Sequence, residues 1–124
     1  MNSTDNWQTP MWLMKIFSEF YDPCPNNFTE DYLNMDVANK NHIFINPPYS
    51  DPKPFILKAI KDHRENPNTT IILLLKNDSS TQWYRALFDA GAHFLMFQER
   101  LHYLYEGTDR GGANFPSILA ILSD

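Results

Sequence analysis

Apolar and polar residues recur along this chain with two different periods, which predicts helices and strands in turn. Three segments carry apolar side chains every three or four positions, the period of a helix, and each begins near a proline or a residue suited to cap a helix. The predicted helices are residues 10–20, capped by Thr9, residues 52–64, and a segment that starts after Asp78 or Ser79 and closes at Gly91.

Four short apolar runs instead have the length of strands. They are residues 42–45, 70–75, 92–97 and 117–122, and a shorter strand is expected to end at Asp22. The polar, glycine-containing segment 106–114 is expected to be a loop. Because strands and helices alternate along the chain, the sequence predicts an α/β fold with parallel neighbouring strands and right-handed crossovers.

The composition predicts one domain over residues 1–124, with a polar and flexible N-terminus at residues 1–6. With 43% hydrophobic residues, the chain has enough apolar surface for one core. No apolar run approaches the roughly 20 residues that span a bilayer, so the expected location is the cytoplasm. Cys24 is the only cysteine, which excludes an internal disulfide framework. The histidines lack the spacing of metal ligands, so no metal site is expected.

The charge differs from that of a typical DNA-binding protein, because 10 basic and 15 acidic residues give a net charge of −5. One basic cluster lies in the predicted second helix and consists of Lys53, Lys58, Lys61 and Arg64. Two interpretations are open for this cluster, a solvated helix face or a surface that contacts nucleic acid.

The sharpest feature is the segment Asn46-Pro47-Pro48-Tyr49, which begins where the apolar run 42–45 ends. In open α/β sheets, ligands bind beyond the carboxyl ends of the strands, which is where this segment is expected. Two successive prolines fix the backbone, so the turn presents carbonyl oxygens in a set direction beside the Asn46 side-chain oxygen. Such an acceptor cluster can hold an NH2 group, and Tyr49 adds a flat face for a planar base. The alternative is a structural turn in which Asn46 is a cap and Tyr49 belongs to the core.

This tetrapeptide resembles the catalytic motif of S-adenosylmethionine-dependent methyltransferases that act on amino groups. Together with other segments, the tetrapeptide forms an ordered set similar to that of the phage-type Dam family of DNA N6-adenine methyltransferases, over roughly residues 7–122. They are Trp7-Gln8-Thr9-Pro10, Asp22-Pro23-Cys24, the tetrapeptide with Ser50, Lys58-Ala59, Leu74-Leu75 and Trp83. The resemblance implies a minimal Rossmann-like methyltransferase fold, with a mostly parallel central sheet flanked by helices. It also implies methyl transfer to N6 of adenine in DNA, and a viral or prophage origin with the host-cell cytoplasm as the location.

The same resemblance implies roles for individual residues. Oxygens of Asn46 and Pro47 would accept hydrogen bonds from the target amine. Pro48 would rigidify the turn, and Tyr49 would stack on the target base. The implied cofactor contacts are Trp7, Thr9, Pro10, Asp22, Pro23 and Asp36, with Asp22 suited to the cofactor ammonium and Asp36 to the cofactor adenine. For Trp7 a packing role stays open, and for Asp36 a solvated turn.

Two departures from the family pattern leave alternatives open. Gly91 is the first glycine, so the glycine-rich loop of many methyltransferases is missing after Asp22. Lys76 stands where many relatives have a proline. The alternatives are the same chemistry on another planar amine, such as cytosine N4, RNA adenine or a glutamine amide, or an inactive or partner-dependent binding module. The expected partner is DNA, either single-stranded or duplex with base flipping. With so short a chain, either sequence specificity is low or a second subunit, as in a homodimer, contributes to it.

Overall fold

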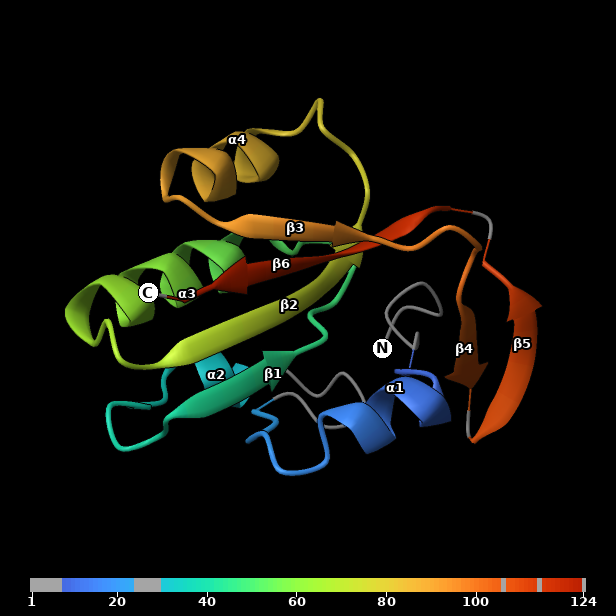
Figure 1. Ribbon diagram of the computed structural model, residues 1–124, viewed down its shortest axis with the longest axis horizontal. Helices are drawn as coiled ribbons and strands as arrows, with labels where there is room; N and C mark the ends of the chain where they lie inside the picture. The colour runs from blue at the N-terminus through green and yellow to red at the C-terminus, as the bar shows by residue number, and fades with distance from the viewer. Residues whose placement is uncertain (1–7, 24–29, 106, 114, 124) are drawn as a thin grey trace.

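The computed structural model describes residues 8–23, 30–105, 107–113 and 115–123. Within these residues, four strands form one sheet in the order β1-β2-β6-β3, and two more form a separate hairpin (Figure 1). The strands are β1 His42–Ile45, β2 Thr70–Lys76, β3 His93–Met96, β4 His102–Tyr105, β5 Thr108–Gly112 and β6 Ser117–Leu122. The helices are α1 Met11–Ile16, α2 Glu30–Leu33, α3 Lys53–Glu65 and α4 Gln82–Asp89. The predicted α/β fold class is therefore correct.

The sheet is mixed, so the prediction of a mostly parallel sheet is wrong. β1 and β2 are parallel neighbours joined through α3, with Ile43 opposite Ile71. Tyr21 adds a parallel bridge to Ile43 on the other side of β1. β6 lies between β2 and β3 and runs antiparallel to both, as its reversed arrow shows in Figure 1. The reversal follows from connectivity, because the chain reaches β6 from the β4–β5 hairpin, at the end of the sheet where β1, β2 and β3 finish.

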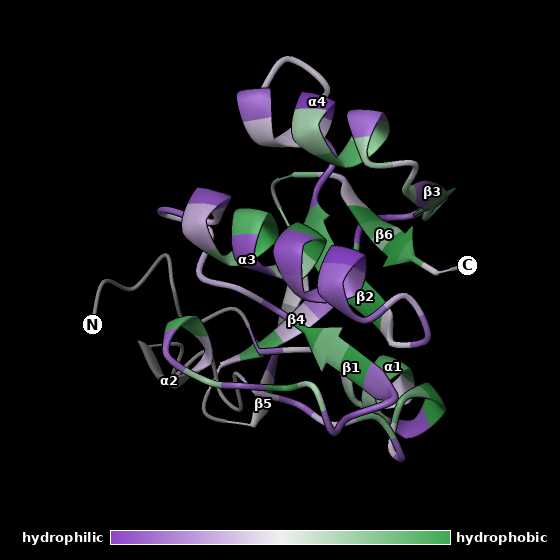
Figure 2. Cartoon of the chain, turned by 90° about the vertical axis from the view of Figure 1, so that its left-hand side faces the viewer, coloured by the Kyte–Doolittle hydropathy of each residue, from purple (hydrophilic) through white to green (hydrophobic). Residues whose placement is uncertain are grey.

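A different layer covers each face of this sheet. Ile43 of β1 and Leu73 of β2 pack with buried residues of α3 and α4. Phe44 and Leu74, the next positions along the two strands, pack with α1 and the hairpin on the other face. Burial on both faces explains why residues 71–75 are all apolar. Figure 2 shows the resulting pattern, with β1 and β6 hydrophobic and with α3 and α4 each hydrophobic on one side and hydrophilic on the other.

Helix α1 ends at Ile16, earlier than predicted. Phe17 terminates it and stacks on Phe44 of β1 with 4.8 Å between ring centroids, so the following apolar residues pack without continuing the helix. Pro10 occupies the N-cap position, so the prediction that Thr9 caps this helix is wrong. The Thr9 hydroxyl instead reaches the turn after β1.

Helix α4 begins after Thr81, whose Oγ1 accepts a hydrogen bond from the Tyr84 N–H at 3.2 Å. The prediction that Asp78 or Ser79 caps this helix is wrong. The Asp78 carboxylate instead accepts a backbone N–H in the turn before the helix. Gly91 follows the helix with a φ of 80°, the left-handed conformation that glycine adopts most easily, as the predicted closure requires.

The hairpin replaces a predicted loop. Residues 108–112 of the segment 106–114 form β5, which pairs antiparallel with β4. Glycine and aspartate are poor strand residues, so the local composition argued against a strand. Pairing with β4 overrides that preference, because the ladder satisfies the backbone hydrogen bonds of both segments.

Candidate active site

The turn that follows β1 is buried. Asn46 is only 2% exposed, and Pro47 and Pro48 are buried as well. Asn46 Nδ2 donates a hydrogen bond to Thr9 Oγ1 at 3.0 Å, a contact between residues 37 positions apart. The structure thus brings the predicted catalytic turn together with the N-terminal segment that was predicted to contact the cofactor.

The other end of the turn, Tyr49, lies in the core with 8% exposure. Its hydroxyl donates to the Leu74 carbonyl at 3.2 Å and lies 2.9 Å from the Tyr103 hydroxyl. Its ring meets the rings of Tyr103 and Phe115 edge-on, at 6.0 and 5.4 Å between centroids. Burial, and secondly the neighbouring Tyr103, raise the pKa of Tyr49 well above its usual value. Burial also raises the pKa of Tyr103 to about 12, so both hydroxyls are protonated at neutral pH.

Beside Tyr49 is a cavity of about 270 Å³, at the carboxyl ends of β1 and β2. Its other lining residues are Ser50, Pro52, Leu75, Lys76, Asp78, Thr81 and Trp83. Lys76 Nζ lies 5.9 Å from the centroid of the Tyr49 ring and 4.7 Å from that of Phe115. Hydrogen bonds from Ser80, and more weakly the charge of Lys76, lower the pKa of Asp78. The cavity thus combines aromatic walls with one positive and one negative side chain.

Sequence reasoning missed part of this cavity. In the sequence, Lys76 stands out only as a departure from a family pattern, and Asp78 only as a possible helix cap. Lys76 ends β2 and Asp78 follows it, so the rule that led to Asn46 could have found both residues as well. Tyr103 had no comparable signal, because its contact with Tyr49 joins residues 54 positions apart.

The segment around Asp22 lies beside β1. The Tyr21 N–H donates to the His42 carbonyl and the Phe44 N–H to the Tyr21 carbonyl, both at 2.9 Å. The short strand predicted to end at Asp22 is only a single bridge, at Tyr21. Because this bridge is parallel, the half-buried Asp22 lies beyond it in the direction in which β1 runs toward Asn46. Pro10 and Pro23, two other predicted cofactor contacts, are buried. Trp7, Cys24 and the predicted flexible N-terminus lie outside the described residues.

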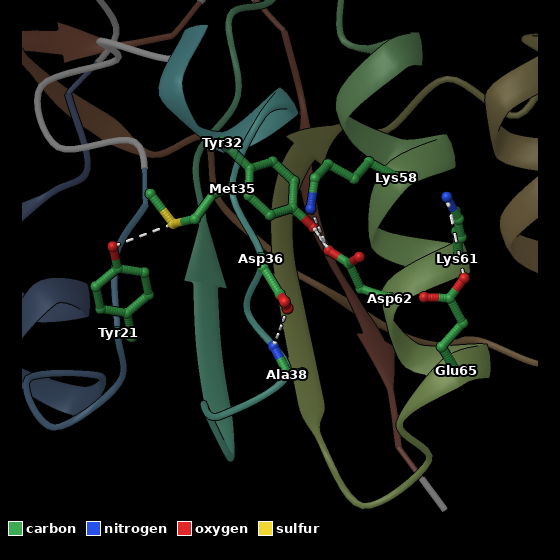
Figure 3. Close-up of polar contacts among 9 residues, drawn as sticks. All are labelled: Tyr21, Tyr32, Met35, Asp36, Ala38, Lys58, Lys61, Asp62 and Glu65. Carbon is green, nitrogen blue, oxygen red and sulfur yellow. Dashed lines mark hydrogen bonds and ion pairs between the residues drawn. The ribbon is translucent and has the colours of Figure 1, made fainter.

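Asp36 is exposed and lies between α2 and β1, where its Oδ1 accepts the Ala38 N–H at 3.0 Å (Figure 3). It borders a groove of about 660 Å³ between this segment and α3, whose apolar lining includes Leu33, Met35, Pro54 and Leu57. The Tyr21 hydroxyl donates to Met35 Sδ at 3.2 Å, so the segment that carries Asp36 contacts the one that carries Asp22.

Two of the four residues in the predicted basic cluster on α3 pair with acidic residues. Lys58 Nζ lies 2.7 Å from Asp62 Oδ2 and 4.2 Å above the centroid of the Tyr32 ring, and the Tyr32 hydroxyl donates to the same carboxylate at 2.8 Å (Figure 3). Lys61 faces Glu65 at 4.0 Å. The remaining two members are Lys53, which donates to Gln82 Oε1 at 3.0 Å, and the exposed Arg64. The pairing reduces the net positive charge of this helix face.

Comparison with known proteins identifies the family. The chain matches the family DNA N-6-adenine-methyltransferase (Dam) over residues 1–123, and it belongs to this family. It is 30% identical over 95 residues to a DNA N-6-adenine-methyltransferase of Haemophilus phage HP1, an alignment that covers 64% of this chain and 54% of the relative. It is 32% identical over 95 residues to a DNA N-6-adenine-methyltransferase of Escherichia phage T1, covering 77% of this chain and 37% of the relative. The chain thus spans about half or less of these relatives' length. No solved structure matches it.

Proposed function

We propose that this domain transfers the methyl group of S-adenosylmethionine to the N6 amino group of adenine in DNA. The observation that carries the proposal is the turn of residues 46–49. It follows the end of β1, is held by Thr9 and borders a cavity, in a chain that belongs to the Dam family. The parallel β1–β2 pair and the site at its carboxyl end support a Rossmann-like fold in which β6 is an antiparallel addition.

The side chains present fit S-adenosylmethionine, which combines a positive sulfonium, an ammonium group and an apolar adenosine. Asp22 supplies a carboxylate for the ammonium at the edge of the sheet. Asp36 supplies a second carboxylate beside the apolar side chains of Leu33, Pro54 and Leu57, which suit an adenine ring. When bound, the cofactor supplies an electrophilic methyl group. We expect Asp22→Ala to weaken binding by a factor of about ten or more in calorimetry, because a charge-assisted hydrogen bond contributes roughly 1.5–3 kcal/mol. Unchanged affinity would exclude Asp22 from the cofactor site.

The chain's own contribution to catalysis is then positional and electrostatic. Asn46 Oδ1 and the Pro47 carbonyl accept hydrogen bonds from the amine, and these bonds strengthen as positive charge develops on its nitrogen. The cavity beside Tyr49 receives the base, with Trp83 as a second aromatic wall. A duplex target must be flipped out of the stack, at a cost of a few kcal/mol. The proposed methyl acceptor is DNA in the host-cell cytoplasm. None of the described helices is long and apolar enough to cross a membrane.

Transfer of labelled methyl from S-adenosylmethionine to oligonucleotides tests the proposal. We expect label in an adenine-containing oligonucleotide and none in a matched one that lacks adenine. Label in a cytosine-containing oligonucleotide without adenine would redirect the chemistry to cytosine N4. Cofactor binding without transfer to DNA, RNA or protein would favour a non-catalytic module.

A further inference from the structure

The β4–β5 hairpin stands at the end of the sheet where β1, β2 and β3 finish, next to the candidate active site (Figure 1). It is anchored in the core by Tyr103, which is fully buried and packs with Phe115 and Tyr49. Two consecutive hairpin residues, Tyr103 and Leu104, are connected to opposite ends of the turn of residues 46–49.

At the Tyr49 end, the connection is a directional chain of hydrogen bonds. A carbonyl oxygen only accepts, so the Tyr49 hydroxyl uses its hydrogen on the Leu74 carbonyl. In the 2.9 Å contact between the two tyrosines, Tyr103 is therefore the donor. Ser117 Oγ, 2.9 Å from the Tyr103 hydroxyl, is in turn the donor to Tyr103. The order Ser117 to Tyr103 to Tyr49 to Leu74 fixes the hydroxyl end of the Tyr49 ring.

At the Asn46 end, the connection runs through the N-terminal segment. The backbones of Gln8 and Leu104 exchange two hydrogen bonds of 2.9 Å, and the Gly107 N–H donates to Gln8 Oε1 at 3.2 Å. The next residue, Thr9, accepts from Asn46 Nδ2 at 3.0 Å. The hairpin thus holds the segment that orients the Asn46 side chain.

We infer that the β4–β5 hairpin is the positioning element of the active site, with Tyr103 fixing the Tyr49 end of the catalytic turn and the Leu104 backbone fixing the Asn46 end through Gln8 and Thr9. The inference rests on the proposed methyl transfer. The two prolines restrict the middle of the turn, so its placement depends on what holds its ends. Catalysis by alignment is sensitive to displacements of about 1 Å, which makes Tyr103 and Ser117 positioning residues for the reaction.

The test is Tyr103→Phe, which removes one oxygen and keeps the ring. The matched control is Tyr84→Phe, because Tyr84 stacks on Phe94 in the opposite core cluster. We expect Tyr103→Phe to lower kcat about tenfold or more, because the loss of one buried hydrogen bond displaces the turn. Calorimetric affinity for S-adenosylmethionine is expected to be unchanged, and Tyr84→Phe is expected to keep the wild-type kcat. Adding Tyr49→Phe to Tyr103→Phe should lower kcat little further, because both break the same chain.

A folded Tyr103→Phe variant with the wild-type kcat would overturn the inference, as would an equal loss of kcat in Tyr84→Phe. If Tyr103→Phe does not fold, Ser117→Ala decides in its place, since it removes only the first donor of the chain. A wild-type chain that methylates nothing would refute the proposed function instead. The positioning inference is then decided by NMR: Tyr103→Phe must shift the backbone amide signals of Tyr49 and Ser50, and unshifted signals would refute it.

Discussion

At the residue scale, Asn46 shows how a short motif acquires its orientation. An asparagine side chain has an NH2 group that donates and a carbonyl oxygen that accepts. Because Nδ2 donates to Thr9 Oγ1, the NH2 end of the amide faces Thr9 and Oδ1 is the other end. The prolines that follow set the direction of the backbone carbonyls in the same turn. Two predictions separate the role of the acceptor from the role of the residue that orients it.

Asn46→Ala is expected to lower the rate of methyl transfer about a hundredfold or more, by analogy with the loss of one stabilising hydrogen bond in an oxyanion site. The reason is differential binding, since Oδ1 interacts more strongly with a nitrogen that is becoming positive than with the neutral amine. Cofactor affinity and fold should be largely retained. Single-turnover transfer and calorimetry on the same sample measure the two effects, and a wild-type rate would reduce the turn to a structural role.

Thr9→Val removes the hydroxyl while keeping the shape of the side chain, whereas Thr9→Ser keeps the hydroxyl. If Thr9 orients Asn46, Thr9→Val should lower kcat about tenfold, whereas Thr9→Ser should keep most of the wild-type kcat. The affinity for S-adenosylmethionine should change little in either variant. A weaker affinity with a normal kcat would instead assign Thr9 to the cofactor, as its sequence context suggested.

At the element scale, α3 carries the basic cluster, but its side chains are unequal. Lys58 and Asp62 have side chains only 16% and 14% exposed, and Lys58 also covers the Tyr32 ring, so this lysine stabilises the packing of α3 against α2. Lys61 and Arg64 are exposed. If this cluster contacts DNA, we therefore expect the contact to depend more on these two residues than on Lys58.

The double variant Lys61→Glu and Arg64→Glu is expected to lower DNA affinity and the salt dependence of binding. The logarithmic slope should fall by about 0.9 for each duplex phosphate contact that is lost. Arg85→Glu is the control, because Arg85 is an exposed base on α4 and pairs with Asp89 at 2.9 Å. Equal slopes for the double variant and the wild type would show that the cluster is a solvated helix face.

At the scale of the whole molecule, one face of the sheet is closed by a cluster in which β1, β2, β4 and β6 meet. The hydroxyls of Tyr49 and Tyr103 lie inside this cluster, and Ser117 of β6 joins them. Segments far apart in sequence are thus held together by polar groups that are protected from water. The stability of the whole domain is therefore linked to the protonation of these two tyrosines.

We expect the free energy of unfolding to fall as the pH rises above about 10, the usual pKa of a tyrosine in an unfolded chain. Burial raises the pKa of Tyr49 above that value and the pKa of Tyr103 to about 12. Above pH 10 the unfolded chain binds fewer protons than the folded one, so unfolding is favoured, whereas below that pH this contribution is fully retained. Urea unfolding at a series of pH values measures the decline, which should be smaller when both tyrosines are replaced by phenylalanine.

The amino-acid sequence by itself determined most of the regular segments and the position of the candidate turn. The bounds of β1 and β6 were predicted correctly, and so was the position of residues 46–49 after β1, because apolar runs and prolines act on the backbone locally. The early end of α1 and the strand β5 were not predictable in this way, since each depends on a packing partner distant in sequence.

Only the tertiary structure decided which strands are neighbours and which side chains meet. The insertion of β6 between β2 and β3, the bond from Asn46 to Thr9 and the contact of Tyr49 with Tyr103 all join distant parts of the chain. Alternation of apolar residues shows that a strand face is buried, but the same alternation suits a parallel or an antiparallel neighbour. The sequence around a polar side chain likewise does not indicate which residue that side chain contacts. The identity of that partner follows from how the layers close around the sheet and leave buried donors close to buried acceptors.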